Sequence, residues 1–477
     1  MNSDRHVLAI ALAALATAGC PERQSPKPPT FPGGGLLGLS TPLPQPDLLG
    51  ALEGVYATSG RFGDSVVVHA STWGSPDDEI QASLAILAKD HFAFALMQPG
   101  CLTDRTASPP TTRLVLEGYW RYLDDPDPSP STTGLVRLFV QPGTVAEALC
   151  QGLVPPAGPP VTLGGATGHG ENAPGDPLGL TWVQARKSRL GTNGRKAFLV
   201  GAHHGGCQSA DNCGVSENTP ETFLLAKQLG ADYLEVDVRL TADSVPVFFH
   251  LGLTPGAVQG VYCSGSVEDY SYAQLVANCR LRAGEIIPRA VDALEYGLTR
   301  TDLGVWLDMK TADAVVPTSQ LLGQLSQRLV PCAPGTPAPP GQRCLFPGSR
   351  PVMDRVIMGL PASDVIEAYQ AAQQATDPAQ QLAPGQLCLV EQDAALLDGI
   401  PCVAWSPRYT RGPMASTVQQ VQAQGKFAGY WTINDPTTID AFLTASAPNG
   451  ILTNYLGLLN HRWEAVGLLP PYPLGIP

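Results

Sequence analysis

The sequence has few charged residues, and basic residues are outnumbered by acidic ones. Asp, Glu, Lys and Arg make up 15% of the 477 residues, and 42 acidic against 29 basic side chains give a formal net charge of −13. Nucleic acids are bound through a surface excess of Lys and Arg, so this balance argues against a nucleic-acid partner. A single phosphate group can still be bound where a metal ion supplies positive charge.

The sequence also lacks a long apolar run and any CxxC pair. No run beyond the N-terminus approaches the ~20 residues of a transmembrane helix, and without CxxC a Cys-ligated metal has little support. Setting Cys20 aside, an even number of the 11 cysteines remains, which in an exported protein indicates disulfides. The order along the chain does not fix the connectivity; we predict pairing of near neighbours, namely Cys101/Cys150, Cys207/Cys213, Cys263/Cys279, Cys332/Cys344 and Cys388/Cys402.

The first twenty residues have the features of an export signal. Arg5 precedes the apolar run 7–18, which is too short to span a bilayer. The run leads into Thr17-Ala18-Gly19-Cys20, which resembles a bacterial lipobox with Thr17 in place of the usual Leu. We therefore expect residues 1–20 to be a lipoprotein signal peptide, with lipid attached at Cys20. The protein would then be anchored to a bacterial membrane, at the outer membrane or on a periplasmic or extracellular face; the alternative is an ordinary secretory signal cut near Ala18.

The next 170 or so residues divide by composition into a linker, a β-rich stretch and a connector. Residues 21–47 are rich in Pro and Gly without periodicity, as in a linker. Residues 48–165 contain short apolar runs separated by Pro, Gly and Asp, which predicts a smaller all-β domain, a sandwich or small barrel, of unknown role. Residues 166–194 are polar and Gly-rich, and we expect a connector there. The candidate strands of the β domain are 65–69, 91–96, 114–120 and 134–140.

From residue 195 onward, strand-like runs alternate with helical stretches. The candidate strands are 197–203, 233–238, 245–250, 304–310, 355–360, 386–390, 427–432 and 450–453. This number of strands, with helices between them over roughly 280 residues, is typical of a (β/α)8 TIM barrel. We therefore predict an α/β fold with a TIM barrel over 195–477, although periodicity alone also allows a doubly wound open sheet.

Carboxylates gather on two of these predicted strands. Glu235 and Asp237 are two residues apart, so both side chains point to the same face of the sheet. They repel each other unless a cation or a shared proton relieves them, and Asp308 on the next long strand would be a third. Three carboxylates without cysteine suit a hard divalent ion, Ca²⁺ or Mg²⁺. The alternative is a Glu-x-Asp pair on a solvent-facing edge.

Three more side chains suit the chemistry of a phosphate ester. His203 and His250 end two different predicted strands, and two imidazoles can act as acid and base on opposite sides of a phosphorus atom. Lys310 shares a face with Asp308 and offers a point charge to a phosphate oxygen. A histidine at a strand end is often only a loop residue, but the order of these groups on successive strands favours metal-assisted cleavage of a phosphodiester.

The same residues lie in segments that resemble the glycerophosphodiester phosphodiesterase family. Residues 202–206 (Ala-His-His-Gly-Gly) resemble its Ala-His-Arg-Gly opening, and residues 217–219 match its Glu-Asn-Thr. Residues 230–238 are close to its Gly-Ala-Asp-x-Ile-Glu-x-Asp-Val, and 247–250 resemble the strand that ends in its second histidine. Later segments with a resemblance are 268–275, 287–288, 430–434 and 450–455. The resemblance implies a phosphodiesterase TIM barrel of the phospholipase-C-like kind.

The resemblance also implies roles for individual residues: metal ligands, an acid/base pair, phosphate contacts and supporting residues. The metal ligands would be Glu235, Asp237 and Asp308, and the acid/base pair would be His203 and His250. Lys310 and His204 would contact the phosphate, and the supporting residues would be Glu217, Asn218, Trp431 and Asn434. Family members hydrolyse glycerophosphodiesters to an alcohol and glycerol 3-phosphate. The expected partner is therefore a small-molecule glycerophosphodiester or a phospholipid headgroup, reached from a membrane through the lipid anchor.

Three positions depart from the family pattern. His204 replaces a phosphate-binding Arg and cannot make its bidentate contact. Asp308 replaces Glu, and Leu251 replaces the Asp that follows the second histidine. We therefore expect weak phosphate binding and an activity that falls as His204 loses its proton. Two alternatives remain open: a phospholipase-D-like lyase that acts on choline lipids, and a degenerate barrel that binds lipid headgroups or a surface partner.

Overall fold

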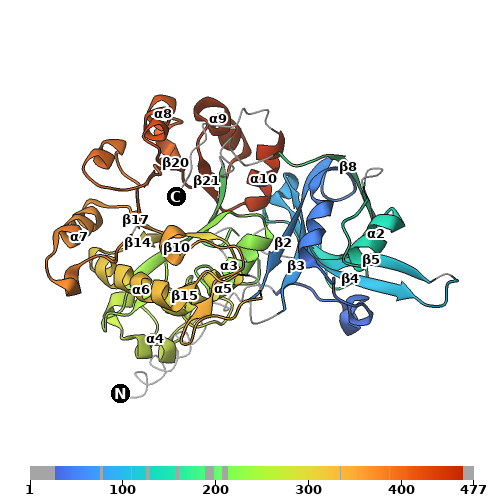
Figure 1. Ribbon diagram of the computed structural model, residues 1–477, viewed down its shortest axis with the longest axis horizontal. Coiled ribbons are helices and arrows are strands. Elements are labelled where there is room, and N and C mark those ends of the chain that lie inside the picture. The colour runs from blue at the N-terminus through green and yellow to red at the C-terminus, as the bar shows by residue number, and fades with distance from the viewer. Residues whose placement is uncertain are drawn as a thin grey trace, which may run out of the picture.

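A computed structural model describes residues 27–75, 79–108, 110–124, 129–156, 161–187, 198–206, 213–333, 335–385 and 387–465. The expected signal peptide and Cys20 lie outside these residues. Two β-structures lie side by side along the long axis of the molecule (Figure 1), the N-terminal one in blue to cyan and the C-terminal one in green to red. Within the described residues, no helix has the length and apolar character needed to cross a membrane.

The N-terminal structure is a closed antiparallel barrel in which each strand pairs with the next and the last pairs with the first. Its strands are β1 (Gly54–Ser59), β2 (Ser65–Trp73), β3 (Gln81–Ala88), β4 (Phe94–Asp104), β5 (Thr111–Arg121), β6 (Thr133–Gln141), β7 (Thr162–Thr167) and β8 (Asp176–Gln184). Helix α2 (Gly143–Cys150) packs against it. Closure leaves no open sheet edge, and apolar side chains that alternate along the strands fill the interior.

Two expectations about the flanks of this barrel need correction. The expected connector, 166–194, contains β8, where Leu178 and Leu180 alternate into the barrel core. The sequence hides this strand because Pro and Gly interrupt its apolar pattern. The expected linker, 21–47, is partly packed on the barrel: Leu43 is buried, and the Leu37 amide donates to Glu117 on β5. This segment forms short 3-10 helices at Pro32–Gly34, Leu37–Leu39 and Pro46–Leu52.

The C-terminal structure is a parallel barrel closed by pairing of β9 with both β10 and β21. Its parallel strands are β9 (Leu199–His203), β10 (Tyr233–Leu240), β14 (Gly304–Met309), β17 (Val356–Leu360), β18 (Leu387–Val390), β19 (Ala404–Trp405), β20 (Phe427–Tyr430) and β21 (Gly450–Thr453). The helices are α3 (Pro220–Gln228), α4 (Tyr272–Asn278), α5 (Ala290–Arg300), α6 (Val315–Arg328), α7 (Ser363–Gln374), α8 (Ala415–Ala423), α9 (Pro436–Ser446) and α10 (Leu456–Ala465). This arrangement is the α/β barrel that the strand rhythm predicted.

One expected barrel strand is wrong, and another strand was missed. Strand β11 (Pro246–Phe248), expected as the third barrel strand, pairs antiparallel with β10 and lies outside the closed ring. The short connection from Leu240 to Pro246 cannot hold the crossover that a parallel neighbour needs. The missing barrel strand is β19, too short to recognise from its sequence. Two small two-stranded sheets, β12 (Val258–Gln259) with β13 (Arg280–Leu281) and β15 (Leu329–Val330) with β16 (Arg343–Cys344), complete the strands.

Large aromatic side chains fill the lower half of the parallel barrel, at the start of its strands. Tyr233 and Trp306 belong to one buried cluster with Phe427. Glycines on neighbouring strands make room for them: a Cβ atom on Gly201 would lie 2.3 Å from the Tyr233 ring, and one on Gly359 would lie 2.2 Å from Nε1 of Trp306. The glycines are therefore required by close approach, and the upper half of the barrel is left to polar side chains.

The two barrels share an apolar interface. Val66 and Val68 point into the core of the antiparallel barrel, whereas Val67 points outward into the core that contains α3 and α10. A polar cluster closes one side of this interface, because Arg186 contacts Glu53 and Glu464 at 3.3 and 3.0 Å. Arg186 follows β8, Glu53 precedes β1 and Glu464 lies on α10, so these contacts tie the two barrels together.

Four of the predicted disulfides are present: Cys101–Cys150, Cys263–Cys279, Cys332–Cys344 and Cys388–Cys402. Cys213 is also disulfide-bonded, while Cys207 lies outside the described residues. Closely spaced cysteines thus pair in order along the chain, which is consistent with an oxidising compartment.

Candidate active site

Three carboxylates meet inside the upper half of the parallel barrel. Glu235 and Asp237 lie on β10, and Asp308 lies directly across from Asp237 on β14. One ligand atom from each carboxylate lies within 4.8 Å of the others, and all three side chains are buried. The expected carboxylate cluster is therefore formed, and it consists of oxygen donors that suit a hard divalent cation.

Lys310 lies between two of these carboxylates. Its Nζ atom is 2.6 Å from Oδ1 of Asp237 and also contacts Oδ2 of Asp308. The side chain is 20% exposed, so it lies at the upper rim of the cluster. From this position it neutralises the carboxylates and lies near any phosphate that approaches them.

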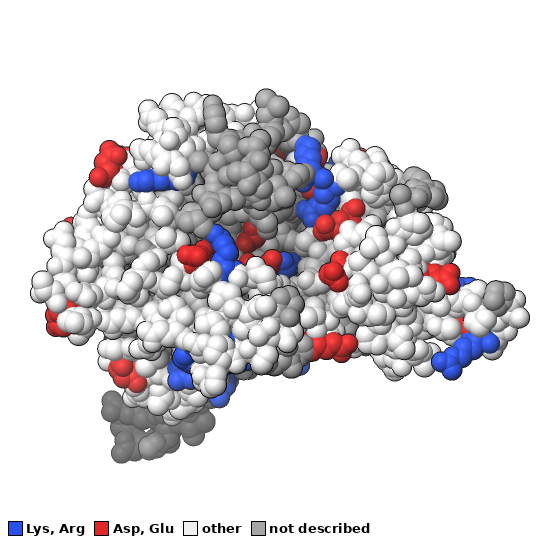
Figure 2. Space-filling view, viewed as in Figure 1, with Lys and Arg blue, Asp and Glu red and all other residues white. Residues whose placement is uncertain are grey.

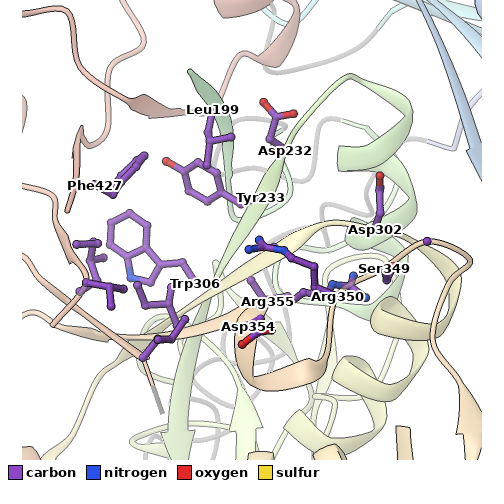
Figure 3. Close-up of a pocket in the computed structure, with 18 residues that line it drawn as sticks. Leu199, Asp232, Tyr233, Asp302, Trp306, Ser349, Arg350, Asp354, Arg355 and Phe427 are labelled. Atoms are coloured by element: carbon purple, nitrogen blue, oxygen red, sulfur yellow. The ribbon is translucent and has the colours of Figure 1, made fainter. Parts of the chain in front are cut away.

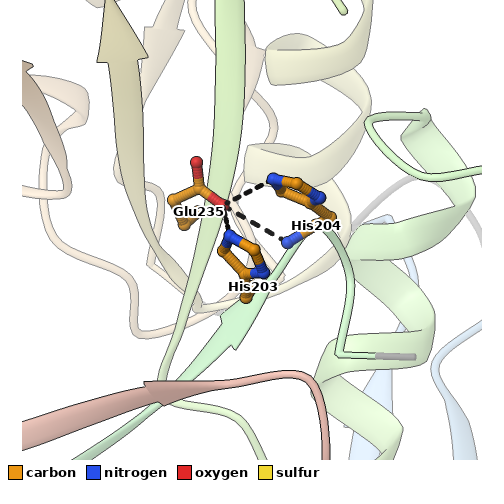
Figure 4. A group of neighbouring side chains, drawn as sticks. All are labelled: His203, His204 and Glu235. Carbon is orange, nitrogen blue, oxygen red and sulfur yellow. Dashed lines mark hydrogen bonds and ion pairs between the residues drawn. The ribbon is translucent and has the colours of Figure 1, made fainter. Parts of the chain in front are cut away.

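His204 is buried, and Figure 4 shows its ring beside His203 and the carboxylate of Glu235. Its Nε2 atom lies 3.1 Å from Asp237, its Nδ1 atom lies 3.1 Å from Glu217, and its amide donates to Glu235. The expected contact of His204 with phosphate does not fit this geometry, because both ring nitrogens already face carboxylates. The imidazole is also too short to reach beyond them as an Arg could.

His203 ends β9 and stacks on His204, with ring centroids 3.8 Å apart. Its Nδ1 atom is 2.6 Å from the side-chain oxygen of Asn454, so Nδ1 carries the proton and Nε2 has a free lone pair. That Nε2 atom lies 4.0 Å from Oε2 of Glu235. Asn454 was not assigned a role from the sequence, although it lies in the segment 450–455 that resembles the family.

His250 reaches the same group of rings from the hairpin of β10 and β11. Its ring contacts that of His204, and the two ring centroids are 4.4 Å apart. Its Nδ1 atom is 3.9 Å from Glu217. Arg239 donates to the backbone oxygen of His250 and to Glu268, which fixes the loop that carries the imidazole. Leu251 is exposed, so Glu217 is the carboxylate that faces this histidine.

The expected supporting residues divide into contacting and more distant groups. Asn218 holds Asp237 from both sides, since it donates to the carboxylate and accepts from the Asp237 amide, each at 2.9 Å. Asn434 accepts from the amide of Asn454, the partner of His203. Trp431 donates to Ser406 and stacks under Arg408; no contact with the charged cluster is found among the described residues.

Glu391 is a fourth buried carboxyl that the sequence did not reveal. It follows β18 and is 5% exposed; burial raises its pKa well above its usual range, and the charge of nearby Asp308 raises it further. No family segment covers it, and Glu-Gln-Asp after a short strand resembles an ordinary loop. Its place in the site becomes visible only when β14, β17 and β18 are side by side.

Burial and mutual charge set the protonation of the cluster. Burial, together with the charge of Asp237, raises the pKa of Glu235 well above its usual range. Burial also raises the pKa of Asp308. Burial would raise the pKa of Asp237 too, but His204 and Lys310 lower it below its usual range. The site thus holds more buried carboxyls than the nearby cations balance, which fits a further cation among them.

The pKa values of the three histidines are shifted in opposite directions. Burial alone would lower the pKa of His204, but Asp237 and Glu235 outweigh it and raise the pKa to about 10. Burial lowers the pKa of His203 well below its usual range, and the charge of His204 lowers it further. Burial and the same charge lower the pKa of His250. At neutral pH His204 is therefore a cation between two neutral imidazoles, each able to accept a proton.

A separate cavity of about 650 Å³ opens at the other end of the barrel (Figure 3). It is lined by residues at strand starts, including Tyr233, Trp306 and Phe427, whose rings face the same space. The carboxylates and histidines lie above these rings, so this cavity is not the candidate active site. On the face shown in Figure 2, charged side chains are sparse and basic ones lie beside acidic ones.

Comparisons with known proteins find similar sequences and structures. Residues 203–279 match the sequence model of the Glycerophosphoryl diester phosphodiesterase family. The "Probable glycerophosphodiester phosphodiesterase 2" of Mycobacterium tuberculosis is 36% identical over 106 residues, which are 22% of this chain and 37% of that relative. The chain therefore spans little more than a third of the length of this relative.

Two solved structures are also similar. One is an Oleispira antarctica phosphodiesterase in complex with the product sn-glycerol-3-phosphate, at 18% identity, 55% coverage of this chain, 96% of that chain and a TM-score of 0.41. The other is a glycerophosphodiester phosphodiesterase from Parabacteroides distasonis, at 16% identity, 57% and 99% coverage and a TM-score of 0.43. Residues 203–279, the segment that matches the sequence model of the Glycerophosphoryl diester phosphodiesterase family, carry both neutral imidazoles and two of the clustered carboxylates.

Proposed function

We propose that this protein hydrolyses glycerophosphodiesters to an alcohol and glycerol 3-phosphate. The observation that supports the proposal most directly is the convergence of His203 and His250, on either side of His204, at the rim of the Glu235, Asp237 and Asp308 cluster. Two neutral imidazoles beside a polyanionic metal-type site are the groups that phosphodiester cleavage needs. The family match of residues 203–279 supports the same substrate class.

The residues act on the substrate in distinct ways. Lys310 draws a phosphate oxygen to the rim by charge, while Asn218 and His204 keep Asp237 ionised and in place. One imidazole takes the proton of the attacking hydroxyl or water. The other imidazole takes up a proton from solvent when the anionic phosphate binds beside it, and it donates that proton to the oxygen of the leaving alcohol. Asn454 keeps the Nε2 lone pair of His203 free for this exchange.

The carboxylate cluster fits a divalent ion of the Ca²⁺ or Mg²⁺ class. Glu235, Asp237 and Asp308 would hold it, since each offers an oxygen within 4.8 Å of the others. When bound, such an ion supplies Lewis-acid stabilisation of the charge that develops on phosphate.

A product assay tests the proposal. The full chain is incubated, with and without chelator, with each of four compounds in separate reactions. Two are glycerophosphodiesters, glycerophosphocholine and glycerophosphoethanolamine, and two are lipids, lysophosphatidylcholine and sphingomyelin. We expect glycerol 3-phosphate from the first two, loss with chelator, and loss in His203→Ala and His250→Ala but not in His169→Ala, an exposed histidine of the other barrel. Cleavage of only the last two lipids would identify the lyase, and uptake of headgroups without cleavage would identify a binding module.

We also propose that the protein is exported and lipid-anchored through Cys20. The support is the lipobox-like sequence 17–20 and the four described disulfides, which persist in oxidising compartments. Fractionation of cells that express the full chain or Cys20→Ser should place only the former in the membrane. Equal release of both into the soluble fraction would contradict the anchor.

A further inference from the structure

The segment 251–289, between β11 and α5, meets the candidate active site at both of its ends. It begins directly after His250, whose ring belongs to the histidine group of the site. Near its other end, Glu285 accepts from the amide and the hydroxyl of Ser216, at 3.2 and 2.7 Å, and Ser216 precedes Glu217 of the site. Whatever this segment binds is therefore brought close to the mouth of the parallel barrel.

The segment has a small hydrophobic core of its own, and two apolar side chains are left outside it. Val258 and Cys263 belong to this core. Between them, Val261 and Tyr262 are 92% and 76% exposed, and these two side chains form the tip of the segment. Single exposed apolar side chains are common on protein surfaces, so their exposure alone decides nothing. The way in which the chain holds the tip is more informative.

The backbone of the tip is fixed on both sides. On the near side, Gly260 has a φ of +133°, and a Cβ atom there would lie 2.0 Å from the backbone oxygen of Asn278, so this close approach to the end of α4 requires glycine. On the far side, Cys263 is disulfide-bonded to Cys279. The tip is thus a preformed apolar surface, and little ordering is needed when it binds.

The charges around the tip suit phospholipid headgroups. No residue from 251 to 267 is charged, so the tip can enter a headgroup layer without burying a charge. Arg280 on β13 pairs directly with Gln259 on β12, beside the tip. Its Nη1 atom donates to the backbone oxygens of Val276 and Cys279, each at 2.6 Å, which fixes the guanidinium without neutralising it. Within the described parts of the chain, no carboxylate pairs with Arg280, so its charge is available to a phosphate group.

We propose that the tip docks on a phospholipid surface, with Val261 and Tyr262 at the boundary between headgroups and acyl chains and Arg280 against the phosphates. Tyrosine is enriched at this boundary because its ring is apolar and its hydroxyl is polar. Apolar side chains and nearby basic ones together give reversible binding to lipid surfaces. This surface is separate from the lipid attachment proposed at Cys20, and it does not depend on the proposed hydrolysis.

Vesicle binding tests the proposal without any turnover. Residues 21–477, which lack the apolar run 7–18 and Cys20 but keep both barrels, are sedimented with vesicles of phosphatidylcholine alone or of phosphatidylcholine mixed with phosphatidylglycerol. We expect binding to both, and tighter binding to the mixed vesicles. The double variant Val261→Ser, Tyr262→Ser should bind both about 10-fold more weakly or worse.

Two further variants separate the charge and the position of the tip. Arg280→Gln should bind the mixed vesicles about 5-fold more weakly, with a smaller effect on phosphatidylcholine alone. The matched control is Leu153→Ser with Val154→Ser, which removes an exposed apolar pair from the other barrel and should change nothing. Tyr262→Trp should bind at least as tightly as the unchanged tip, because Trp has the same preference for the boundary.

Several results would overturn the proposal. One is an unchanged tip that sediments with neither kind of vesicle, and another is an equal loss of binding in the tip and control variants. If sedimentation velocity shows a dimer that the tip variant dissociates, a second copy of the chain covers the tip instead. Should the serine variant fail to fold, Tyr262→Trp still decides, since clearly weaker binding contradicts docking at the boundary. Vesicle binding without diester cleavage removes only the proposed function.

Discussion

Nε2 of His204 lies 3.1 Å from Oδ2 of Asp237, and the two side chains are almost completely buried, at 2% and 0% exposure. Burial opposes a charge on His204, but the charges of Asp237 and Glu235, with Glu217 beside them, outweigh it and explain why His204 is cationic. Asp237 is correspondingly held ionised. The position that an Arg occupies in the family pattern therefore keeps a positive charge here, but one directed at carboxylates.

This pair makes the metal-free protein sensitive to alkaline pH. The pKa of His204 rises from 6.5 to about 10 on folding, so its stabilising contribution is complete below pH 6.5 and is lost as pH rises through about 10. In the presence of chelator, the free energy of unfolding of the wild type should decrease from pH 6.5 to about pH 10, relative to that of His204→Gln. Urea unfolding at several pH values measures the difference; curves that remain parallel would contradict the assignment.

The raised pKa of His204 shifts the expected loss of activity to higher pH. An activity that depends on protonated His204 should decline near pH 10 rather than near 6.5. A kcat/KM profile of the wild type against that of His204→Gln isolates this limb. A shared alkaline limb would mean that another group causes it.

Divalent ions should stabilise the protein through the three carboxylates. An ion at 100 times its Kd stabilises the folded state by about 2.7 kcal/mol, which raises the melting temperature. Asp308→Asn should reduce this shift, because it removes one of the three ligands whose atoms lie within 4.8 Å. Differential scanning calorimetry with and without Ca²⁺ measures the effect, and Asp313→Asn, an exposed aspartate, is the control. An equal shift in all three proteins would be evidence against the site.

The amide of Asn454 should control the proton of His203. Asn454→Leu removes the acceptor 2.6 Å from Nδ1, which frees the other tautomer and the ring. We expect kcat to fall about 10- to 100-fold with little change in KM. Asn454→Asp restores an acceptor, and its charge should raise the pKa of His203 and shift the acidic limb of the pH profile upward. If KM rises in the Leu variant while kcat stays unchanged, Asn454 binds substrate instead.

Arg186 should hold the two barrels together. Arg186→Met leaves buried Glu464 without its partner at 3.0 Å, and breaking such a pair costs about 3 kcal/mol or more. Arg289→Met, which breaks an exposed pair with Asp292, should cost less than about 1 kcal/mol. Urea denaturation compares the two variants. Equal destabilisation would mean that the cluster adds nothing beyond a surface pair.

The sequence was sufficient for those parts of the site that are local. Glu235 and Asp237 share a face because strands alternate. The expected strand order put 245–250 between them and Asp308, and β14 lies directly beside β10 only because β11 is outside the ring. Glu391 could not be found, since it comes near Asp308 only because β14, β17 and β18 lie side by side. Long-range contacts of this kind leave no local pattern.

The fold was predictable to a similar degree. Long apolar strands and their order gave the parallel barrel, but the two-residue strand β19 and the interrupted strand β8 carry too little pattern to recognise. The antiparallel direction of β11 was within reach of the sequence, because the short connection after Leu240 excludes a crossover.

The rings of Tyr233 and Trp306 form an apolar floor under the carboxylates. Each ring lies on the same strand and the same face as a carboxylate two residues further on, so these anions stand on a medium that screens charge poorly. Low-dielectric walls focus the negative potential of these carboxylates toward the mouth. A cation or a protonated ligand approaching from solvent on that side is drawn inward, while the cavity below the floor has charged lining residues of its own, Asp232, Asp302, Arg350, Asp354 and Arg355.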